Sequence, residues 1–172
     1  MSQELIISSP GNEEELRQVA ELERQCSHST YLDPPSGITT AVIESWGWGT
    51  SRYHDRFINP AEADMWVGRI GSIVVGYAGA SHIPNHATYP GPYVQKLYVH
   101  PAHQNCGYGR MLLNAAETWL TGKGCQLAQL NVATKNTGAR RFYEKSGYAL
   151  FGDLPSDRAY PGIPELIYTK SL

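Results

Sequence analysis

The stretch HPAHQNCGYGRMLLNAAETWL, residues 100–120, constrains the fold of this chain more than any other. It places two glycines, Gly107 and Gly109, between a β-branched and aromatic segment at residues 93–99 and a long amphipathic pattern. The first segment has the composition of a β-strand. In the pattern that follows, apolar side chains recur at i, i+3, i+4 and i+7 from Leu112 onward, which is the period of a helix. The sequence therefore predicts a strand, a glycine-rich loop and a helix in direct succession.

A glycine-rich loop at the start of a helix is suited to an anionic ligand. The N–H groups of the first helical turn have no partner within the helix, and the helix dipole adds roughly half a positive charge there. Glycines let a ligand approach the backbone closely, and phosphate is the usual ligand of such a loop. The spacing fits neither a dinucleotide fingerprint nor a P-loop, because Leu112 stands where the fingerprint needs a third small residue and no G-K-[ST] follows. A connector that binds nothing is the plainer alternative for the loop alone.

The spacing Gln104-x-x-Gly107-x-Gly109 resembles the Q/R-x-x-G-x-G/A signature of the GNAT superfamily, the acetyl-CoA-dependent N-acetyltransferases. A second stretch, KNTGARRFYEKSGYALFGDL at residues 135–154, resembles the pattern N-x-x-A-x-x-F/L-Y-x-x-x-G-F/Y of the same family. Two motifs in the family's order, separated by a predicted strand, are more specific than either alone, and the resemblance extends over residues 93–153. The second pattern is met by Asn136, Ala139, Phe142, Tyr143, Gly147 and Tyr148.

The resemblance implies a single GNAT domain over residues 1–172, of the α/β class in its α+β form. The family fold is a mixed, mostly antiparallel, twisted sheet of about seven strands with helices on both faces, and its fourth and fifth strands splay apart. The patterns along this chain predict the same order of elements. Strands are expected at residues 4–8, 93–99, 126–133, 148–153 and 165–172, a hairpin at 64–83 with its turn near Gly71, and helices at 11–26, 38–48, 51–59, 110–121 and after Asn136.

In this family the loop amides cradle the coenzyme A pyrophosphate, and the pantetheine arm lies between the splayed strands like an additional strand. The resemblance therefore implies acetyl-CoA as the cosubstrate, with backbone groups of Leu97 and Val99 bonded to the pantetheine amides. Cys106 lies in the loop, where a helix N-terminus lowers the pKa of a thiol, but a filler position within the motif is the plainer interpretation. The cofactor-binding residues implied are Leu97, Tyr98, Val99, Gln104, Asn105, Cys106, Gly107, Tyr108, Gly109, Arg110, Asn136 and Tyr143.

Acetyl transfer to an amine needs a proton acceptor and a proton donor. A free alkylamine has a pKa near 10 and must be neutral to attack, while the departing thiolate leaves more easily when an acid protonates it. The resemblance makes Tyr143 the expected catalytic acid, because its phenol is protonated at neutral pH. The alternative is that Tyr143 is one more aromatic side chain on the apolar face of its helix.

No proton acceptor for the amine stands out in the sequence. Some family members carry a glutamate on the fourth or fifth strand, and in the branch that acetylates protein N-termini a glutamate stands at the position of Asn131, so that branch fits less well. An ordered water chain, His82 or His86 are the alternatives, since a histidine has a suitable pKa. The polar side chains on the corresponding strands here are Gln95, Lys96, Gln129 and Asn131, and we interpret Lys96 as a solvated strand residue.

The acceptor site in this family is built from the first two helices and the loops before the fourth and last strands. Aromatic rings and carboxylates together suit a cationic amine. The alternative is that the rings belong to the core and the acids are solvated. In this chain those regions carry Tyr31, Trp46, Trp48, Tyr53, Tyr89, Tyr93 and Tyr160, with Asp33, Glu44, Asp55, Asp157 and Glu165.

The expected function is an N-acetyltransferase that moves an acetyl group from acetyl-CoA to a primary amine of a small molecule by direct transfer in a ternary complex. The alternatives are a protein lysine or N-terminal acetyltransferase and a non-catalytic acyl-CoA-binding regulatory module. A formal net charge of −2 favours neither a nucleic-acid nor a membrane partner. The three cysteines have no metal-type spacing, and the start of the chain lacks signal-peptide character, so no metal and a cytoplasmic location are expected. The family often forms homodimers, and a homodimer stays open.

Overall fold

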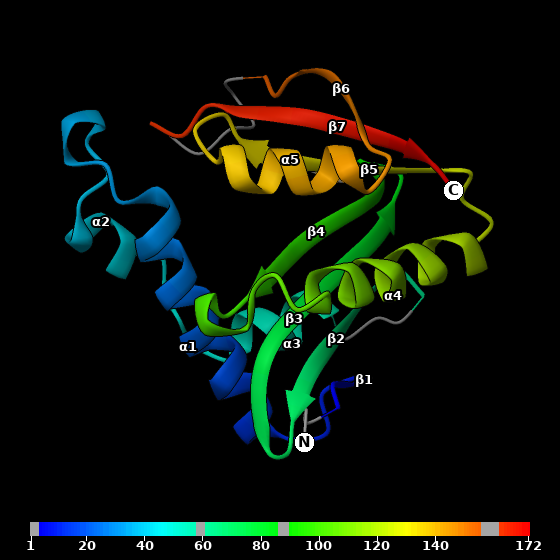
Figure 1. Ribbon diagram of the computed structural model, residues 1–172, viewed down its shortest axis with the longest axis horizontal. Coiled ribbons are helices and arrows are strands. Elements are labelled where there is room, and N and C mark those ends of the chain that lie inside the picture. The colour runs from blue at the N-terminus through cyan, green and yellow to red at the C-terminus, as the bar shows by residue number, and fades with distance from the viewer. Residues whose placement is uncertain (1–3, 58–60, 86–89, 156–161) are drawn as a thin grey trace.

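The computed structural model describes residues 4–57, 61–85, 90–155 and 162–172, with the backbone alone at residues 55–57. The elements follow one another in the predicted order (Figure 1). They are β1 (Ile6–Ser8), α1 (Glu13–Tyr31), α2 (Thr40–Glu44), α3 (Ser51–Phe57), β2 (Ala63–Ile70), β3 (Ile73–Ile83), β4 (Gly91–Val99), α4 (Tyr108–Gly122), β5 (Leu127–Ala133), α5 (Thr137–Lys145), β6 (Ala149–Asp153) and β7 (Glu165–Ser171), with single 3₁₀ turns at Pro34–Ser36 and Pro101–His103.

The strands form one seven-stranded sheet in the order β1-β2-β3-β4-β5-β7-β6. Neighbours are antiparallel except for β4 and β5, which are parallel and meet at the pair Tyr93 and Gln129. Toward their C-terminal ends β4 and β5 diverge, and Figure 1 shows β5, β7 and β6 standing apart from β2, β3 and β4. The predicted mixed sheet with a splay between the fourth and fifth strands is confirmed.

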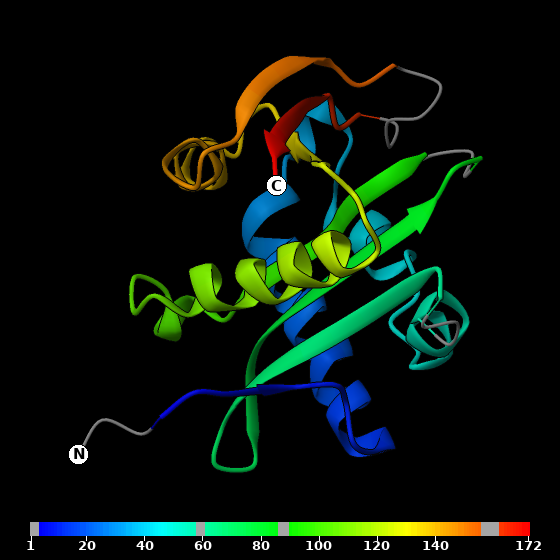
Figure 2. The ribbon, with the colours of Figure 1, turned by 90° about the vertical axis from the view of Figure 1, so that its right-hand side faces the viewer.

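Helices cover both faces of the sheet. Side chains on successive strand residues point to opposite faces, so apolar residues are available to helices on each face. One core cluster joins the apolar side of α4, including Leu112 and Leu120, to β5 residues such as Leu130. A second cluster joins α1 residues such as Val19 to Val67 and other residues of β2 and β3. Figure 2 shows α1 and α4 crossing the strands on opposite sides of the sheet. Within the described residues, no helix combines the length and apolar character needed to cross a membrane.

Helix α1 begins as predicted but ends later. The Oδ1 atom of Asn12 accepts a hydrogen bond from the N–H of Glu15 at 2.9 Å, and the Glu15 carboxylate accepts one from the N–H of Gly11 at 2.7 Å. This is a capping box in which the carboxylate reaches one residue beyond the cap. The sequence pattern placed the end at residue 26, whereas the helix continues to Tyr31. The additional turn brings residues 29–31 to the functional site.

Candidate active site

A cavity of about 720 Å³ lies where β4 and β5 diverge. Six segments contribute to its wall: the last turn of α1, β4, the glycine-rich loop, β5, α5 and the first residue of β7. The cavity therefore joins both predicted motifs in one site. Its lining residues include Cys26, Thr30, Tyr31, Gln95, Lys96, Leu97, Val99, Gln104, Gly107, Arg110, Asn131, Asn136, Tyr143 and Glu165.

The glycine-rich loop forms one end of this cavity. Gly107 is the N-cap of α4 with φ 83°, a left-handed conformation that favours glycine, and no side chain caps the helix. A Cβ atom at Gly107 would meet nothing within 4 Å, so the space beside the loop is open. The Nε2 atom of Gln104 donates to the carbonyl of Val99 at 3.0 Å and holds the loop against β4. The first N–H groups of α4 are thus presented without a side-chain partner, as an anion site requires.

Most of the residues expected to bind the cofactor line this cavity. Cys106 and Tyr108 do not: the Cys106 side chain is exposed with Sγ 3.5 Å from the carbonyl of Gln104, and the Tyr108 ring stacks on His103. The Val99 carbonyl, expected to face the pantetheine arm, already accepts the Gln104 amide. The expected residues that line the cavity are Leu97, Tyr98, Val99, Gln104, Asn105, Gly107, Gly109, Arg110, Asn136 and Tyr143.

Tyr143 reaches the cavity from α5. The Oδ1 atom of Asn136 accepts a hydrogen bond from the N–H of Ala139 at 3.1 Å, so Asn136 is the N-cap of α5. The Tyr143 ring is buried and packs edge-on against Phe142 and Tyr148, with ring centroids 5.3 Å and 5.8 Å away. Burial, with a smaller contribution from Tyr31, raises the pKa of Tyr143. The phenol therefore keeps its proton at neutral pH.

A buried ion pair lies behind the β4 wall of the cavity. The Glu23 carboxylate is 2% exposed, and the Nζ atom of Lys96 lies 2.6 Å from its Oε1 atom. Tyr53 donates to the other oxygen at 2.9 Å, and Tyr77 also donates to it. Burial alone would raise the pKa of Glu23, but the charges of Lys96 and Arg52 outweigh it and lower the pKa to about 2. Lys96 is thus a partly buried partner of Glu23, and the interpretation as a solvated residue is wrong.

Glu165 is a site residue that sequence reasoning did not assign to proton transfer. It opens β7 and pairs with Ala133 at the end of β5. Among the described residues that line the large cavity, it carries the only carboxylate. Burial raises its pKa, while a hydrogen bond with Asn131 and the charge of Lys96 act in the opposite direction. The residue types on β4 and β5 could not reveal it, because the pairing between β5 and β7 brings it there.

The remaining acceptor-side residues have different surroundings. Tyr31 lines the cavity, whereas Tyr93 is buried on β4 and Asp33 forms an ion pair with Lys135. His82, an alternative proton acceptor, lies on β3 and is not among the described residues that line the cavity. Trp46 and Trp48 pack on a small cluster around Ile43. Outside the described residues lie His86, Tyr89, Asp157 and Tyr160, together with the side chain of Asp55.

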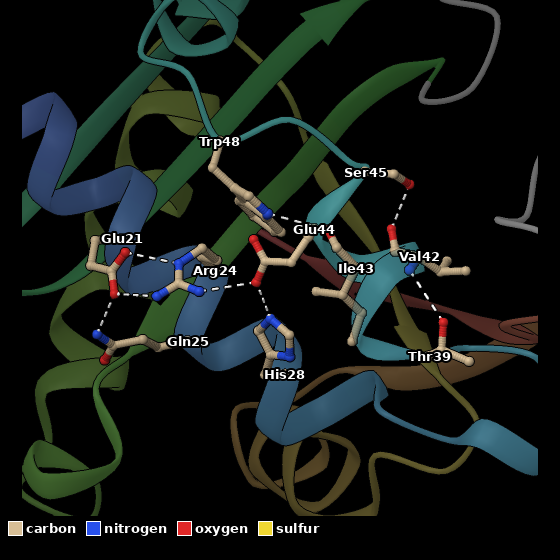
Figure 3. A network of polar contacts seen from close by, with 10 residues as sticks. All are labelled: Glu21, Arg24, Gln25, His28, Thr39, Val42, Ile43, Glu44, Ser45 and Trp48. Carbon is tan, nitrogen blue, oxygen red and sulfur yellow. Dashed lines mark hydrogen bonds and ion pairs between the residues drawn. The ribbon is translucent and has the colours of Figure 1, made fainter.

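Helix α2 is fixed beside the last turns of α1. The Glu44 Oε1 atom accepts a hydrogen bond from Arg24 at 3.0 Å and contacts the ring of His28, and Trp48 Nε1 donates to the carbonyl of Ile43 at 3.2 Å (Figure 3). Glu44 therefore anchors α2 to α1. A second cavity of about 250 Å³ lies nearby and shares Thr30 and Tyr31 with the first; its other lining residues are Leu32, Asp33, Ser36, Ile38, Ala133, Lys135, Gly162, Ile163 and Pro164.

Solved structures with a similar fold include acetyltransferases. PaiA N-acetyltransferase of Thermoplasma acidophilum, solved with coenzyme A, has a TM-score of 0.79 at 20% identity, covering 98% of this chain and 99% of its own. An acetyltransferase of Streptococcus agalactiae has a TM-score of 0.72 at 17% identity, covering 100% of each chain. The yncA protein of Salmonella typhimurium, solved with acetyl-CoA, has a TM-score of 0.70 at 18% identity, covering 98% of this chain and 94% of its own. No curated protein sequence matches the chain. The profile of the Acetyltransferase (GNAT) family matches residues 16–148, and the chain therefore belongs to this family of acetyl-CoA-dependent acyltransferases.

Proposed function

We propose that this enzyme acetylates the primary amine of a small molecule, by direct transfer between two substrates bound together. The observation that carries the proposal is a single cavity with an uncapped helix N-terminus at one end, a buried tyrosine in its wall and a carboxylate at its acceptor side. A catalyst that holds both substrates in contact gains much of its rate from positioning. PaiA and yncA support the proposal, because structures of the same fold hold coenzyme A and acetyl-CoA.

The residues present suit a coenzyme with a pyrophosphate. The open space beside Gly107 and the unpartnered first turn of α4 favour an anion there. Arg110 lines the same cavity, and its guanidinium is held by a hydrogen bond from Nη2 to the carbonyl of Lys145 at 2.9 Å. Asn136 uses Oδ1 to cap α5, which leaves its Nδ2 donor for a ligand. When bound, acetyl-CoA supplies an activated acyl group as a thioester.

Tyr143 is the proposed acid. Tyr143 lines the cavity and its raised pKa keeps the phenol protonated, which supports donation of the Oη proton to a thiolate departing there. The acceptor side favours a small molecule over a protein substrate. The ion pair of Glu44 with Arg24 holds α2 against α1, and the second cavity has a volume of about 250 Å³. A cytoplasmic location, expected from the sequence, belongs to the same proposal.

Two charge-adding variants test the cofactor site. Gly107→Glu puts a carboxylate where the pyrophosphate is expected. Gly124→Glu is a matched control just past the far end of α4, since Gly124 also has a positive φ of 80° and a Cβ atom there would meet nothing within 4 Å. Isothermal titration with acetyl-CoA should give micromolar binding for the wild type and Gly124→Glu, and none for Gly107→Glu. Thiol release with a panel of primary amines then tests turnover. A wild type that does not bind acetyl-CoA at millimolar concentration contradicts the proposal.

A further inference from the structure

Among the described residues, the Glu165 carboxylate has no counter-ion of its own, since it takes part in none of their ion pairs. Lys96 is the cation that acts on it, but the Lys96 ammonium lies 2.6 Å from Glu23, whose charge it balances. A half-buried carboxylate without a cation is costly, and a bound cation would relieve that cost.

The second cavity adjoins Glu165. Ile163 and Pro164, the two residues before Glu165, line it together with Ala133, which is the register partner of Glu165 in β5. Tyr31 lines both cavities. A short carbon chain lying against these apolar residues would therefore present its terminal group at Glu165, at the boundary between the two cavities.

We infer that Glu165 receives the acceptor as an alkylammonium ion and accepts its first proton. This inference rests on the proposed function. The ammonium N–H bond breaks, the proton goes to a Glu165 carboxylate oxygen, and the neutral nitrogen keeps the electron pair with which it attacks the acyl carbon. The carbon–sulfur bond breaks, and the thiolate takes the proton of Tyr143. The second nitrogen proton then restores Tyr143, and Glu165 releases its proton to water, so atoms and charges balance.

The groups around Glu165 support this role. Asn131 on β5 hydrogen-bonds the carboxylate, Lys96 on β4 is the charged neighbour, and Tyr31 and Tyr143 line the same cavity from α1 and α5. Burial outweighs Asn131 and Lys96 and raises the pKa of Glu165. A raised pKa makes a carboxylate a stronger base.

The test compares two amines of similar shape and different basicity. Ethylamine is an ammonium ion at neutral pH, whereas the fluorines of trifluoroethylamine withdraw electrons and leave it mostly neutral. Thiol release from acetyl-CoA is measured for the wild type, Glu165→Gln and the control Glu14→Gln, an exposed glutamate of α1 paired with Arg17. Glu165→Gln should lose about 100-fold in kcat/KM with ethylamine and less than about threefold with trifluoroethylamine, with Glu14→Gln unchanged for both.

A pH series separates proton transfer from a structural role. The ratio of wild-type to Glu165→Gln activity with ethylamine should shrink as the pH rises from about 7 toward about 10, because the amine then deprotonates in water. An equal loss for both amines, or a ratio independent of pH, overturns the inference while the proposed function stands. A wild type that binds acetyl-CoA but acetylates neither amine overturns the proposed function and the inference with it.

Discussion

The Nζ atom of Lys96 lies 2.6 Å from the Oε1 atom of Glu23, which places the ammonium of a cavity-lining strand residue on a carboxylate that is 2% exposed. Tyr53 and Tyr77 satisfy the other oxygen of that carboxylate. The arrangement joins α1 to β4 at the level of the site. Since Lys96 is engaged by Glu23, the charge of Glu165 is available to a ligand. Glu165 carries the only carboxylate among the described residues that line the cavity.

Removing one partner of this pair should destabilise the protein. We expect Lys96→Met to lower the free energy of unfolding by about 3–5 kcal/mol, because Glu23 would remain buried without its nearest cation. The double variant Glu23→Gln with Lys96→Met should be more stable than the sum of the two single changes predicts. Urea denaturation of the four proteins measures this coupling. Additive effects would show that the pair contributes nothing.

The same pair should give a pH signature. The pKa of Glu23 is lowered from 4.5 to about 2, so its contribution to stability is fully present above pH 4.5 and is lost as the pH falls toward 2. Compared with Glu23→Gln, the wild type should lose its advantage across this window. Unfolding midpoints of both proteins from about pH 2 to about pH 7 test the expectation, and parallel curves contradict it.

Glu165 should act on stability in the opposite sense. Its pKa is raised, so the ionised form costs stability as the pH rises from 4.5 through the raised value. Glu165→Gln should therefore be more stable than the wild type at neutral pH, and the difference should vanish below pH 4.5. Thermal unfolding on either side of this window measures it. A variant less stable than the wild type at neutral pH would mean that the carboxylate serves the fold.

Tyr143→Phe removes the proposed acid and keeps the buried ring. We expect kcat to fall by about 100-fold with the Kd for acetyl-CoA within about twofold, since only proton donation is lost. Tyr148→Phe is the matched control, because its ring packs on Tyr143 but does not line the cavity. Thiol-release kinetics and calorimetry separate the two effects. An unchanged kcat in Tyr143→Phe would remove it from the acid role.

Asn136 should show two separable roles. Asn136→Ala loses the cap of α5 and about 1 kcal/mol of stability, while Asn136→Asp keeps an accepting oxygen and therefore the cap. Both variants lose the Nδ2 donor, so both should bind acetyl-CoA more weakly than the wild type. Denaturation measures the first effect and calorimetry the second. Full affinity in Asn136→Asp would confine the residue to capping.

Local signals in the sequence were sufficient for the order of elements and the loop. The caps at Asn12 and Asn136 and the left-handed Gly107 each depend on neighbours within a few residues. The end of α1 was missed because the contact of His28 with Glu44, sixteen residues away, belongs to tertiary structure.

Two other features also depend on distant parts of the chain. Lys96 was misinterpreted because strand alternation does not reveal that α1 covers its face of the sheet and supplies Glu23. Glu165 could be recognised as an acid near the acceptor, but its place in the cavity follows from pairing with Ala133, which is 32 positions away in the sequence. Long-range strand pairing carries no local signal of this kind.

Among the described residues, the two parts of the sheet are joined only where β4 and β5 pair at Tyr93 and Gln129. Beyond that pair, the sides of β4 and β5 that face each other have no further strand pairing, whereas the other neighbouring strands of the described sheet are paired along several residues. We expect the coenzyme to enter this gap and to bond to both strands, and so to complete the sheet while it is bound. Thermal stability should therefore rise with coenzyme concentration, as mass action requires, and hydrogen exchange along β4 and β5 should slow together.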